Sequence, residues 1–223
     1  MKIPRHIAII LDGNRRYAKK RRLQPWKGHE AGADNVKKLA DWAIELGVKE
    51  LTLYTFSTEN FDRTKREKAF LFNLFRKKFR ELKDSRDDIE LGVFGNFSRF
   101  PKDVQKTLNR IAKKGKKKKK LVINFAMGYG GRAEIVNAVQ ELVKKKISSR
   151  KINENMIKNY LYLKNDPEIV IRPGGEVRTS NFLMWQSAYS EWFFTNKLWP
   201  EFTKKDLVKV IAEYNSRERR FGK

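Results

Sequence analysis

The stretch "RHIAIILDGNRRYAKK", residues 5–20, joins a short apolar run to a strongly cationic segment. All five residues at 7–11 are apolar, and they lead directly into Asp12, Gly13 and Asn14. A continuous apolar run of this length, bounded by turn residues, predicts a β-strand that is buried on both faces. Asp12 would therefore lie at the carboxyl end of a buried strand and be surrounded by cations.

Similar apolar runs alternate with helical periodicity along the rest of the chain. Strands are expected at 6–11, 50–56, 89–95, 121–127, 168–172 and 191–195. Helices are expected near Gly13, before Gly47, and at about 66–84, 102–113, 131–146, 153–163 and 204–219. This alternation predicts an α/β fold, with an open, mainly parallel six-stranded sheet flanked by helices in a single domain over residues 1–223.

The composition limits the classes of partner and cofactor. Lys and Arg number 51 against 26 acids, a net charge of +25, which favours nucleic acid, anionic lipid headgroups or phosphorylated small molecules as partners. The chain has no cysteine and two histidines, so any metal is expected to be a hard cation bound by oxygen. The run at 113–120, "KKGKKKKK", is interpreted as a solvated turn.

The sequence also bears on the compartment. No apolar run approaches the ~18 residues that a membrane span requires. Asp12 interrupts the first apolar segment too early for a signal peptide. We therefore expect a cytosolic protein.

Polar clusters follow the expected strands, where ligands of open α/β sheets bind. A helix beginning near Gly13 would direct free N–H groups toward an anion, and Arg16 would add charge, as in a diphosphate cradle. The alternative is that Asp12 caps this helix. After the fifth strand, Arg172, Arg178 and Ser180 in "RPGGEVRTSN" could hold a second phosphorylated group, or could face water from a tight turn.

Other candidates are weaker individually. Ser57, Asn60 and Arg63 in "STENFDR" could orient a substrate, although Asn60 alone would more often be a cap. His29 in "GHEAG" could bond a phosphate oxygen, yet a lone histidine is usually structural. Glu191, inside an aromatic run, suggests either a buried ion pair or a metal ligand.

The expected helix at 66–84 carries more Phe and Leu than one face of a surface helix normally buries. The excess is explained either by core packing or by an apolar binding groove.

Together these motifs closely resemble the cis-prenyltransferases, the undecaprenyl diphosphate synthase family. The resemblance covers residues 4–222 and rests on "HIAIILDGNRRYAKK", "GHEAG", "LTLYTFSTENFDR", "GYGGRAEIVNA", "IRPGGEVRTSNFLMWQSAYSEWFF", "LWPEF" and "RERRFG".

The resemblance implies a homodimeric α/β domain with a hydrophobic tunnel. It implies Mg2+-dependent consecutive condensation of isopentenyl diphosphate onto an allylic diphosphate primer, which gives a cis-polyprenyl diphosphate and releases diphosphate. The primer, from dimethylallyl to geranylgeranyl diphosphate, stays open. A peripheral contact with the inner face of the membrane is expected, and a nucleic-acid partner is not.

Roles are carried over by matching positions. Asp12 and Asn60 match catalytic residues, and Asp12 and Glu191 match metal ligands, Glu191 for the site of the opposing subunit. Residues matching the allylic diphosphate site are Gly13, Asn14, Arg15, Arg16, His29 and Arg63. Residues matching the isopentenyl diphosphate site are Arg172, Arg178, Ser180, Arg220 and Gly222. Tyr17, Ser57 and Phe61 match other substrate contacts.

Features of this sequence that differ from the family pattern affect these roles. Pro25 stands where many relatives carry an arginine, so a phosphate contact is lost there. Bulky residues of the Phe-rich helix predict a short to medium product, with Phe72 or Phe75 as the floor of the tunnel. The competing class is a binding protein, either a basic nucleic-acid or membrane module or a non-catalytic subunit of a heteromeric prenyltransferase.

Overall fold

A computed structural model describes residues 2–85, 87–112 and 119–217, without the side chains of 82–85. One sheet has the order β3-β4-β2-β1-β5-β6, and each neighbouring pair is parallel. Its strands are β1 (His6–Ile10), β2 (Glu50–Ser57), β3 (Ile89–Phe94), β4 (Leu121–Tyr129), β5 (Ile169–Pro173) and β6 (Glu191–Thr195). The predicted six-stranded parallel sheet is confirmed.

Seven α-helices lie within the described residues. They are α1 (Asn14–Lys20), α2 (Pro25–Leu46), α3 (Lys65–Ser85), α4 (Lys102–Ala112), α5 (Gly131–Lys144), α6 (Glu154–Tyr160) and α7 (Lys204–Ser216). Short 3-10 turns, η1 (Thr58–Asp62), η2 (Ser149–Lys151) and η3 (Trp199–Glu201), connect some of them. The capping box that starts α7, formed by Thr203 and Asp206, has both of its hydrogen bonds.

Helix α2 begins well before the apolar periodicity that predicted it. Pro25 occupies its first turn, where proline is tolerated because the first N–H groups have no partner in the helix. Gly28 and Gly32 then lie directly against Asn14 of α1, and an added Cβ would come within 1.9 Å and 2.2 Å of its oxygens. These turns pack against backbone and polar atoms rather than a wide apolar surface, so the apolar pattern is missing.

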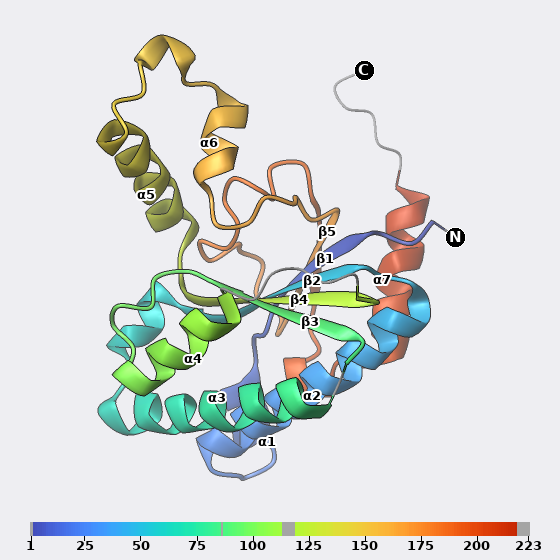
Figure 1. The fold of residues 1–223 in the computed structure, drawn as a ribbon. Helices are drawn as coiled ribbons and strands as arrows, with labels where there is room; N and C mark the ends of the chain where they lie inside the picture. The colour runs from blue at the N-terminus through green and yellow to red at the C-terminus, as the bar shows by residue number, and fades with distance from the viewer. Residues whose placement is uncertain (1, 86, 113–118, 218–223) are drawn as a thin grey trace.

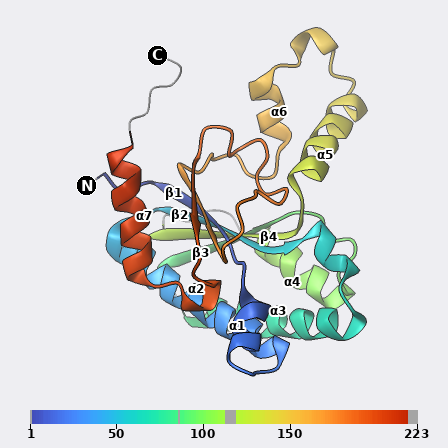
Figure 2. The ribbon, with the colours of Figure 1, turned by 180° about the vertical axis from the view of Figure 1, so that it is seen from behind.

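The sheet is covered on both faces, because alternate residues of each strand point to opposite sides. Ile7 and Ile9 of β1 join the core beneath α2, α3, α4 and α7. Ala8 and Ile10 join a smaller core beneath the loop between β5 and β6. Figure 1 shows α5 and α6 on the side of this loop, with the other helices on the opposite side, and Figure 2 shows the same layers from behind.

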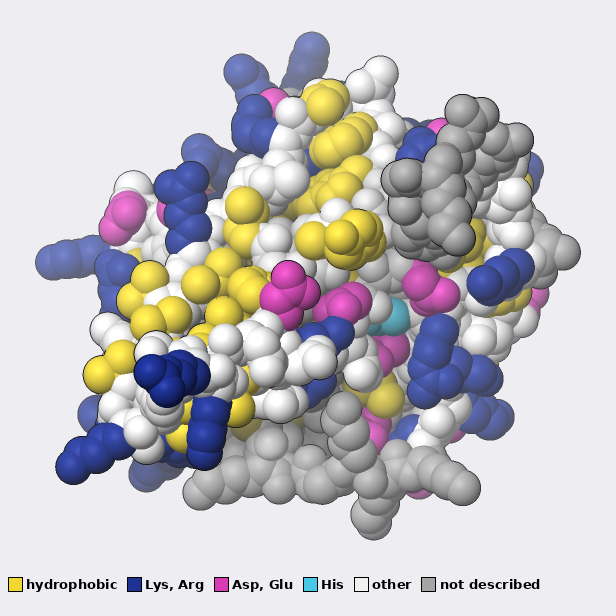
Figure 3. Space-filling model, turned by 90° about the horizontal axis from the view of Figure 1, so that it is seen from above, with side chains coloured by type: hydrophobic (Ala, Val, Ile, Leu, Met, Phe, Trp, Pro, Cys, Tyr) yellow, Lys and Arg dark blue, Asp and Glu magenta, His cyan; other side chains and the backbone are white. Residues whose placement is uncertain are grey.

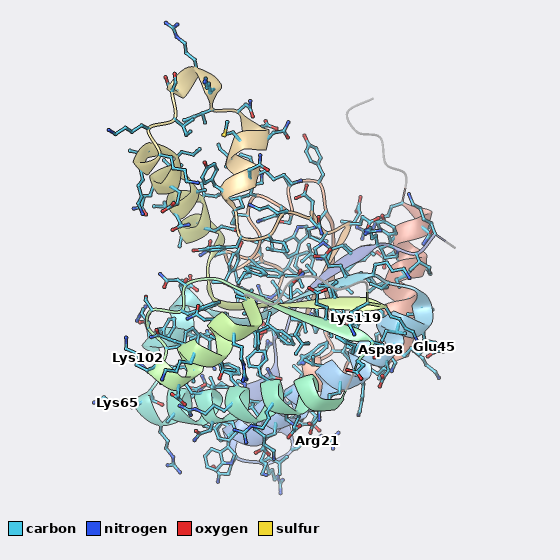
Figure 4. The ribbon with its side chains drawn as sticks, in the orientation of Figure 1. Arg21, Glu45, Lys65, Asp88, Lys102 and Lys119 are labelled. Carbon is cyan, nitrogen blue, oxygen red and sulfur yellow. The ribbon has the colours of Figure 1, made fainter. Side chains whose placement is uncertain are left out.

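Much of the positive charge lies on the outside of this body. Arg21, Lys65 and Lys102 lie on the outer surface around α1, α3 and α4 (Figure 4). The lysine-rich run predicted as a turn falls mainly at 113–118, outside the described residues. Within the described part of the chain, every helix is too short or too polar to cross a bilayer.

Candidate active site

The site lies at β1, where the order in which strands are added to the sheet reverses. From β1 the chain adds β2 on one side, and β5 occupies the other side of β1. Loops that follow two such strands diverge and leave a crevice at their carboxyl ends. Asp12 follows β1 and Arg172 lies at the end of β5, and they meet there with 2.9 Å between Arg172 Nη2 and Asp12 Oδ2.

The carboxylate of Asp12 is held from three directions. Besides the bond from Arg172, its Oδ1 accepts hydrogen bonds from the backbone N of Gly13 at 2.6 Å and from Arg16 Nη2 at 3.1 Å. Burial works to raise the pKa of Asp12, but the hydrogen bond from Arg172 and the charge of Arg16 outweigh it, so its pKa lies below the usual value. Asp12 is therefore an anion at neutral pH.

The alternative role of Asp12 as a helix cap is wrong. Gly13 occupies the N-cap position of α1, and no side chain caps this helix. Gly13 has φ of +100°, which favours glycine, and its Cα lies against Leu198. The backbone N of Trp199 donates to Asp12 O at 2.9 Å, so the segment after β6 fixes this turn.

Arg172 is buried, with 4% of its surface exposed. Its Nη1 donates to the carbonyl of Arg178 at 2.5 Å and to Ser180 Oγ at 2.7 Å, which ties the following loop to Asp12. Its Nε is buried and lacks a hydrogen-bond partner among the described residues. Gly174, at φ of +103°, lets its carbonyl accept a bond from Arg16 Nη1 at 2.5 Å. The three predicted residues of this loop are thus brought together with the Asp12 turn.

The turn after β2 contributes Ser57 and Asn60. Asn60 Oδ1 accepts a hydrogen bond from Ser57 N at 3.2 Å, and the two side chains form a capping box for η1. Both line the same cavity as Asp12. Asn60 therefore caps the turn, as its sequence context favoured, and also reaches the candidate site.

His29 lies on α2 beside Arg63 and Glu67. Its Nε2 is buried and stands 3.8 Å from Glu67 Oε1, too far for a hydrogen bond. Arg63 Nη1 instead donates to Glu67 at 2.6 Å. Burial and the neighbouring charge of Arg63 lower the pKa of His29 to about 4, against the opposing effect of Glu67. The imidazole is consequently neutral at pH 7.

The neutral state of His29 makes stability depend on pH. Because the pKa is about 4 in the folded chain and 6.5 ordinarily, protons bind the unfolded chain more readily. The contribution of neutral His29 to the free energy of unfolding is present above pH 6.5 and is lost as the pH falls toward 4. We expect acidification from pH 7 to 4.5 to cost the wild type about 2–3 kcal/mol more than His29→Gln, measured by urea unfolding. Equal losses in both proteins would contradict this assignment.

A cavity of about 640 Å³ runs inward from these residues. We call its opening the polar rim, formed by Asp12, Arg172, Arg178 and Ser180 together with Arg16, which is bonded to Asp12. We call its inner part the apolar end, which is lined by Val36, Leu71, Leu74, Phe75, Phe79 and Phe125.

A second cleft, of about 630 Å³, adjoins the first and shares Leu11, Asp12, Asn14, His29 and Arg63 with it. It extends over Gly13, Arg15, Arg16 and Pro25. All six residues predicted for the allylic diphosphate therefore border this cleft. Asn14 also has a structural bond, because its Nδ2 donates to Leu11 O at 3.1 Å.

Several predicted contacts lie elsewhere. Phe61 packs in the core, 4.8 Å in ring-centroid distance from Phe56, with Arg99 over its ring. It therefore faces its core neighbours rather than the cavity. Tyr17 lies half-buried under Arg21 on α1 and is not among the residues that line either space. Arg220 and Gly222 fall outside the described residues.

Glu191 begins β6, whereas Asp12 follows the end of β1, so the two residues lie at opposite ends of the parallel strands. Glu191 is aligned with Ile169, which is aligned with Ile7, so the backbone positions of Glu191 and Asp12 are separated by roughly 15–20 Å within one chain. Glu191 Oε2 accepts a bond from Arg217 Nη1 at 2.7 Å, the ion pair that its aromatic context favoured. A role as metal ligand thus depends on a second copy of the chain.

The two residues predicted as the floor of the tunnel differ in their relation to the cavity. Phe75 lines the apolar end, whereas Phe72 packs against Phe56 and Phe100. The two residues lie three positions apart on α3, and both rings contact Phe56. The Phe-rich sequence does not reveal that only Phe75 of the two lines the cavity.

The sequence reasoning missed several residues that line the cavity. One of them is Asn181, whose Oδ1 accepts a hydrogen bond from the backbone N of Arg132, at the start of α5, at 2.8 Å. Its Nδ2 donates to Glu59 at 3.3 Å. Trp199 and Lys78 also line the cavity. Asn181 could have been found from its place in "RPGGEVRTSN", but Lys78 lies in an ordinary charged helix and gave no signal.

A basic rim that suits phosphorylated groups, above a mainly apolar space, is typical of the class of enzymes that act on diphosphates with hydrophobic tails. A model of the Prenyltransf family, described as "Putative undecaprenyl diphosphate synthase", matches residues 10–222. The chain belongs to this family, and it is a cis-polyprenyl diphosphate synthase, a transferase that condenses isopentenyl diphosphate onto an allylic diphosphate.

Relatives with similar sequences match nearly the whole chain. It is 46% identical to "Tritrans,polycis-undecaprenyl-diphosphate synthase (geranylgeranyl-diphosphate specific)" of Pyrococcus furiosus, over 99% of this chain and 88% of that protein. It is 47% identical to "Isoprenyl transferase" of Streptococcus pyogenes, over 99% and 94%. The crystal structure of lavandulyl diphosphate synthase from Lavandula x intermedia, in complex with dimethylallyl diphosphate, has a TM-score of 0.88 at 35% identity, over 99% of this chain and 98% of that one.

Proposed function

We propose that the two diphosphates bind side by side across the polar rim while the prenyl chain occupies the apolar end. The allylic diphosphate lies over Gly13–Arg16, next to His29 and Arg63, and the isopentenyl diphosphate lies against Arg172, Arg178 and Ser180. The observation that carries this proposal is the contact of Asp12 with Arg172 at the mouth of an apolar cavity. Cations and an anionic carboxylate meet where the tail must enter.

The direct test is incorporation of radiolabelled isopentenyl diphosphate into an organic-soluble product. Assays with dimethylallyl, geranyl, farnesyl and geranylgeranyl diphosphate, resolved by thin-layer chromatography, would identify the primer and the product length. Because the Pyrococcus relative is named as specific for geranylgeranyl diphosphate, we propose the same primer for this chain. Absence of labelled product with all four primers would reject the proposed activity.

The donor set at the rim fits Mg2+. Within the described residues, no group of three acidic or histidine side chains could hold a metal without further ligands. Mg2+ is usually bound through one or two carboxylates together with substrate phosphates and water. The anionic Asp12 fits such a site, and Glu191 of a second copy is the other proposed ligand. When bound, Mg2+ would neutralise charge on the diphosphate groups.

The residues of the chain itself would stabilise the departing diphosphate. Breaking the allylic C–O bond builds negative charge on that group, and Arg15, Arg16 and Arg63 lie in position to attract it. Neutral His29 could donate a hydrogen bond there without changing its charge. The apolar end excludes water from the carbocation-like carbon.

The double bond of isopentenyl diphosphate attacks this carbon to form the new carbon–carbon bond, and loss of a proton from the resulting cation forms the new double bond. Asn60 is the candidate to hold the acceptor, either a water or a diphosphate oxygen. Its Oδ1 is engaged with Ser57 N, so its amide Nδ2 is the group that would face the substrate.

Product length provides a matched pair of variants on one helix. Phe75 and Phe72 are equally buried on α3, with 8% exposed each, but Phe75 lines the apolar end. We expect Phe75→Ala to lengthen the product by at least one isoprene unit, because it extends the space for the tail. Phe72→Ala is expected to destabilise the chain by about 3–5 kcal/mol without changing the product. Equal product ladders for Phe75→Ala and wild type, on thin-layer chromatography, would contradict this role.

A homodimer is proposed from an exposed apolar surface. We call it the α5 face, formed by Val136, Val139 and Val143 with Met184, which lies against Gly131 at the start of α5. Val143 is 70% exposed and Val136 55%. Figure 3 looks down on this side of the sheet and shows hydrophobic side chains gathered there. Such a surface is typical of an interface, and a second copy would supply Glu191, Arg220 and Gly222 to the neighbouring site.

Charge placed in the α5 face should separate the dimer. We expect Val139→Glu to shift the sedimentation-equilibrium mass from two chains to one, since a buried unpaired carboxylate is costly. Asn109→Glu, at an exposed position of α4 on the other side of the sheet, is the control and should remain dimeric. A wild-type chain that sediments as a monomer would reject the dimer.

The proposed location is the cytoplasm, with peripheral contact at the inner face of the membrane. The net charge of +25 favours anionic lipid, and a growing polyprenyl tail partitions into the bilayer. Co-sedimentation with vesicles containing phosphatidylserine, compared with uncharged vesicles, would test this contact.

A further inference from the structure

One residue that lines the cavity beside the apolar end is charged. Among the described residues of α3 that line the cavity, Leu71, Leu74, Phe75 and Phe79 are apolar and the fifth is Lys78. Positions separated by three, four and seven residues share one face of a helix, so Lys78 points to the same side as its apolar neighbours. A lysine at this place is unexpected in a space that accommodates a hydrocarbon chain.

The ammonium group of Lys78 is held at a fixed place. Its Nζ donates to Asp34 Oδ1 of α2 at 2.8 Å and to Glu81 Oε2 of α3 at 3.1 Å, and its side chain is 18% exposed. Burial works to lower the pKa of Lys78, but the hydrogen bonds to Asp34 and Glu81 raise it above the usual value. Lys78 is therefore cationic; it lines the cavity, and its ammonium group lies between two carboxylates.

The same group of charges joins α2 to α3. Glu81 Oε2 also accepts a bond from Lys37 Nζ of α2 at 2.7 Å. We call Asp34, Lys37, Lys78 and Glu81 the charged clasp. The two helices lie side by side in Figures 1 and 2, and the clasp crosses the seam between them.

The clasp lies at the end of the cavity that is remote from the polar rim. Helix α3 starts just after the carboxyl end of β2, next to Asn60, and returns the chain to the start of β3. It therefore runs from the carboxyl ends of the strands, where the rim lies, toward their amino ends. Lys78 lies on the helix turn after Phe75, so a tail that grows inward from the rim passes Phe75 before it reaches the clasp.

We propose that Lys78 is a specificity-determining residue that ends elongation of the prenyl chain. A tail that extends beyond Phe75 meets an ammonium group that two carboxylates hold in place. Further growth must either put hydrocarbon against that charge or pull it away from Asp34 and Glu81, and both are unfavourable. This role rests on the proposed binding of the tail in the apolar end and deepens it by assigning what limits its length.

The test compares product lengths of four proteins with labelled isopentenyl diphosphate and the primer that the wild type uses best. Lys78→Met retains the apolar stem and removes the charge, and we expect its main product to be longer by at least one isoprene unit. Lys78→Arg retains the charge and should give the wild-type length. Lys37→Met breaks the other ion pair across the same seam, but Lys37 is not among the described cavity-lining residues, so its product should also be unchanged.

The outcomes separate the possible explanations. An unchanged product from Lys78→Met overturns the role of Lys78, and so does equal lengthening by Lys37→Met, which would assign the limit to the seam as a whole.

If Lys78→Met fails to fold, Asp34→Asn replaces it, because Asp34 is 58% exposed in its side chain and its amide would hold the ammonium less firmly. Asp34→Asn is then expected to add longer products, and an unchanged ladder overturns the role. If the wild type makes no prenyl product, the proposed activity itself is refuted. If the wild type is active and the variant gives the same product ladder, only this inference is refuted.

Discussion

Asp12→Ala is expected to lower kcat/KM by about 10³-fold or more at saturating Mg2+. The substitution removes the carboxylate proposed to hold the metal and leaves Arg16 and Arg172 without their shared anionic partner. Those two guanidinium groups would then bind the diphosphates in altered positions, so the loss should fall mainly on kcat. Initial rates with labelled isopentenyl diphosphate, measured across a Mg2+ titration, check this result.

Asp103→Ala is the matched control for Asp12→Ala. Asp103 is also paired with an arginine, Arg76, but the pair lies on the surface between α3 and α4. Its loss is expected to leave kcat/KM unchanged. Full turnover by Asp12→Ala, with a melting curve like that of the wild type, would remove the basis for the proposed metal site.

Arg172→Lys should lower kcat/KM by about 10²-fold although the charge is retained. Arg172 makes its three hydrogen bonds from two nitrogens of one planar group, to Asp12, to the carbonyl of Arg178 and to Ser180. A lysine ammonium cannot reproduce that fork, and the loop after β5 would lose its connection to Asp12. Steady-state kinetics with each substrate varied in turn would measure the change.

Arg178→Lys distinguishes position from charge. Arg178 is exposed, and its guanidinium is bonded to Glu176 at 2.5 Å rather than to Asp12. We expect a smaller effect, below about 10-fold, that appears mainly in KM for isopentenyl diphosphate. If Arg178→Lys were as damaging as Arg172→Lys, the buried fork would not be the feature that organises this loop.

The arrangement of the sheet could be predicted from local patterns. A strand buried on both faces must be apolar at consecutive positions, and β1 shows this directly, because Ile7 and Ile9 face one core while Ala8 and Ile10 face the other. Placement of polar clusters after such strands then located Asp12 and Arg172 at one edge of the sheet. The early start of α2 could not be predicted, because its first turns pack Gly28 and Gly32 onto Asn14, a contact with no apolar periodicity.

Only part of the candidate site could be predicted from the sequence. The motif resemblance assigned Phe61 to the substrate, but the ring is enclosed by Phe56, Phe100 and the guanidinium of Arg99. The choice between Phe72 and Phe75 depends on how α3 is rotated against the sheet, which is decided by the residues that face it from other elements. Lys78 was missed for the same reason, since its partner Asp34 lies 44 positions earlier in the chain.

The sequence by itself determined the order of strands and helices, the basic surface and the family, because these depend on side-chain types and on spacing along a single segment. Tertiary structure alone decided which groups touch. It brought Arg172 to Asp12 across 160 positions, left His29 neutral by burying it beside Arg63, and placed a charged clasp at the end of an apolar cavity. Those outcomes depend on burial and on distances between separate elements, and neither quantity is encoded in the neighbourhood of any one residue.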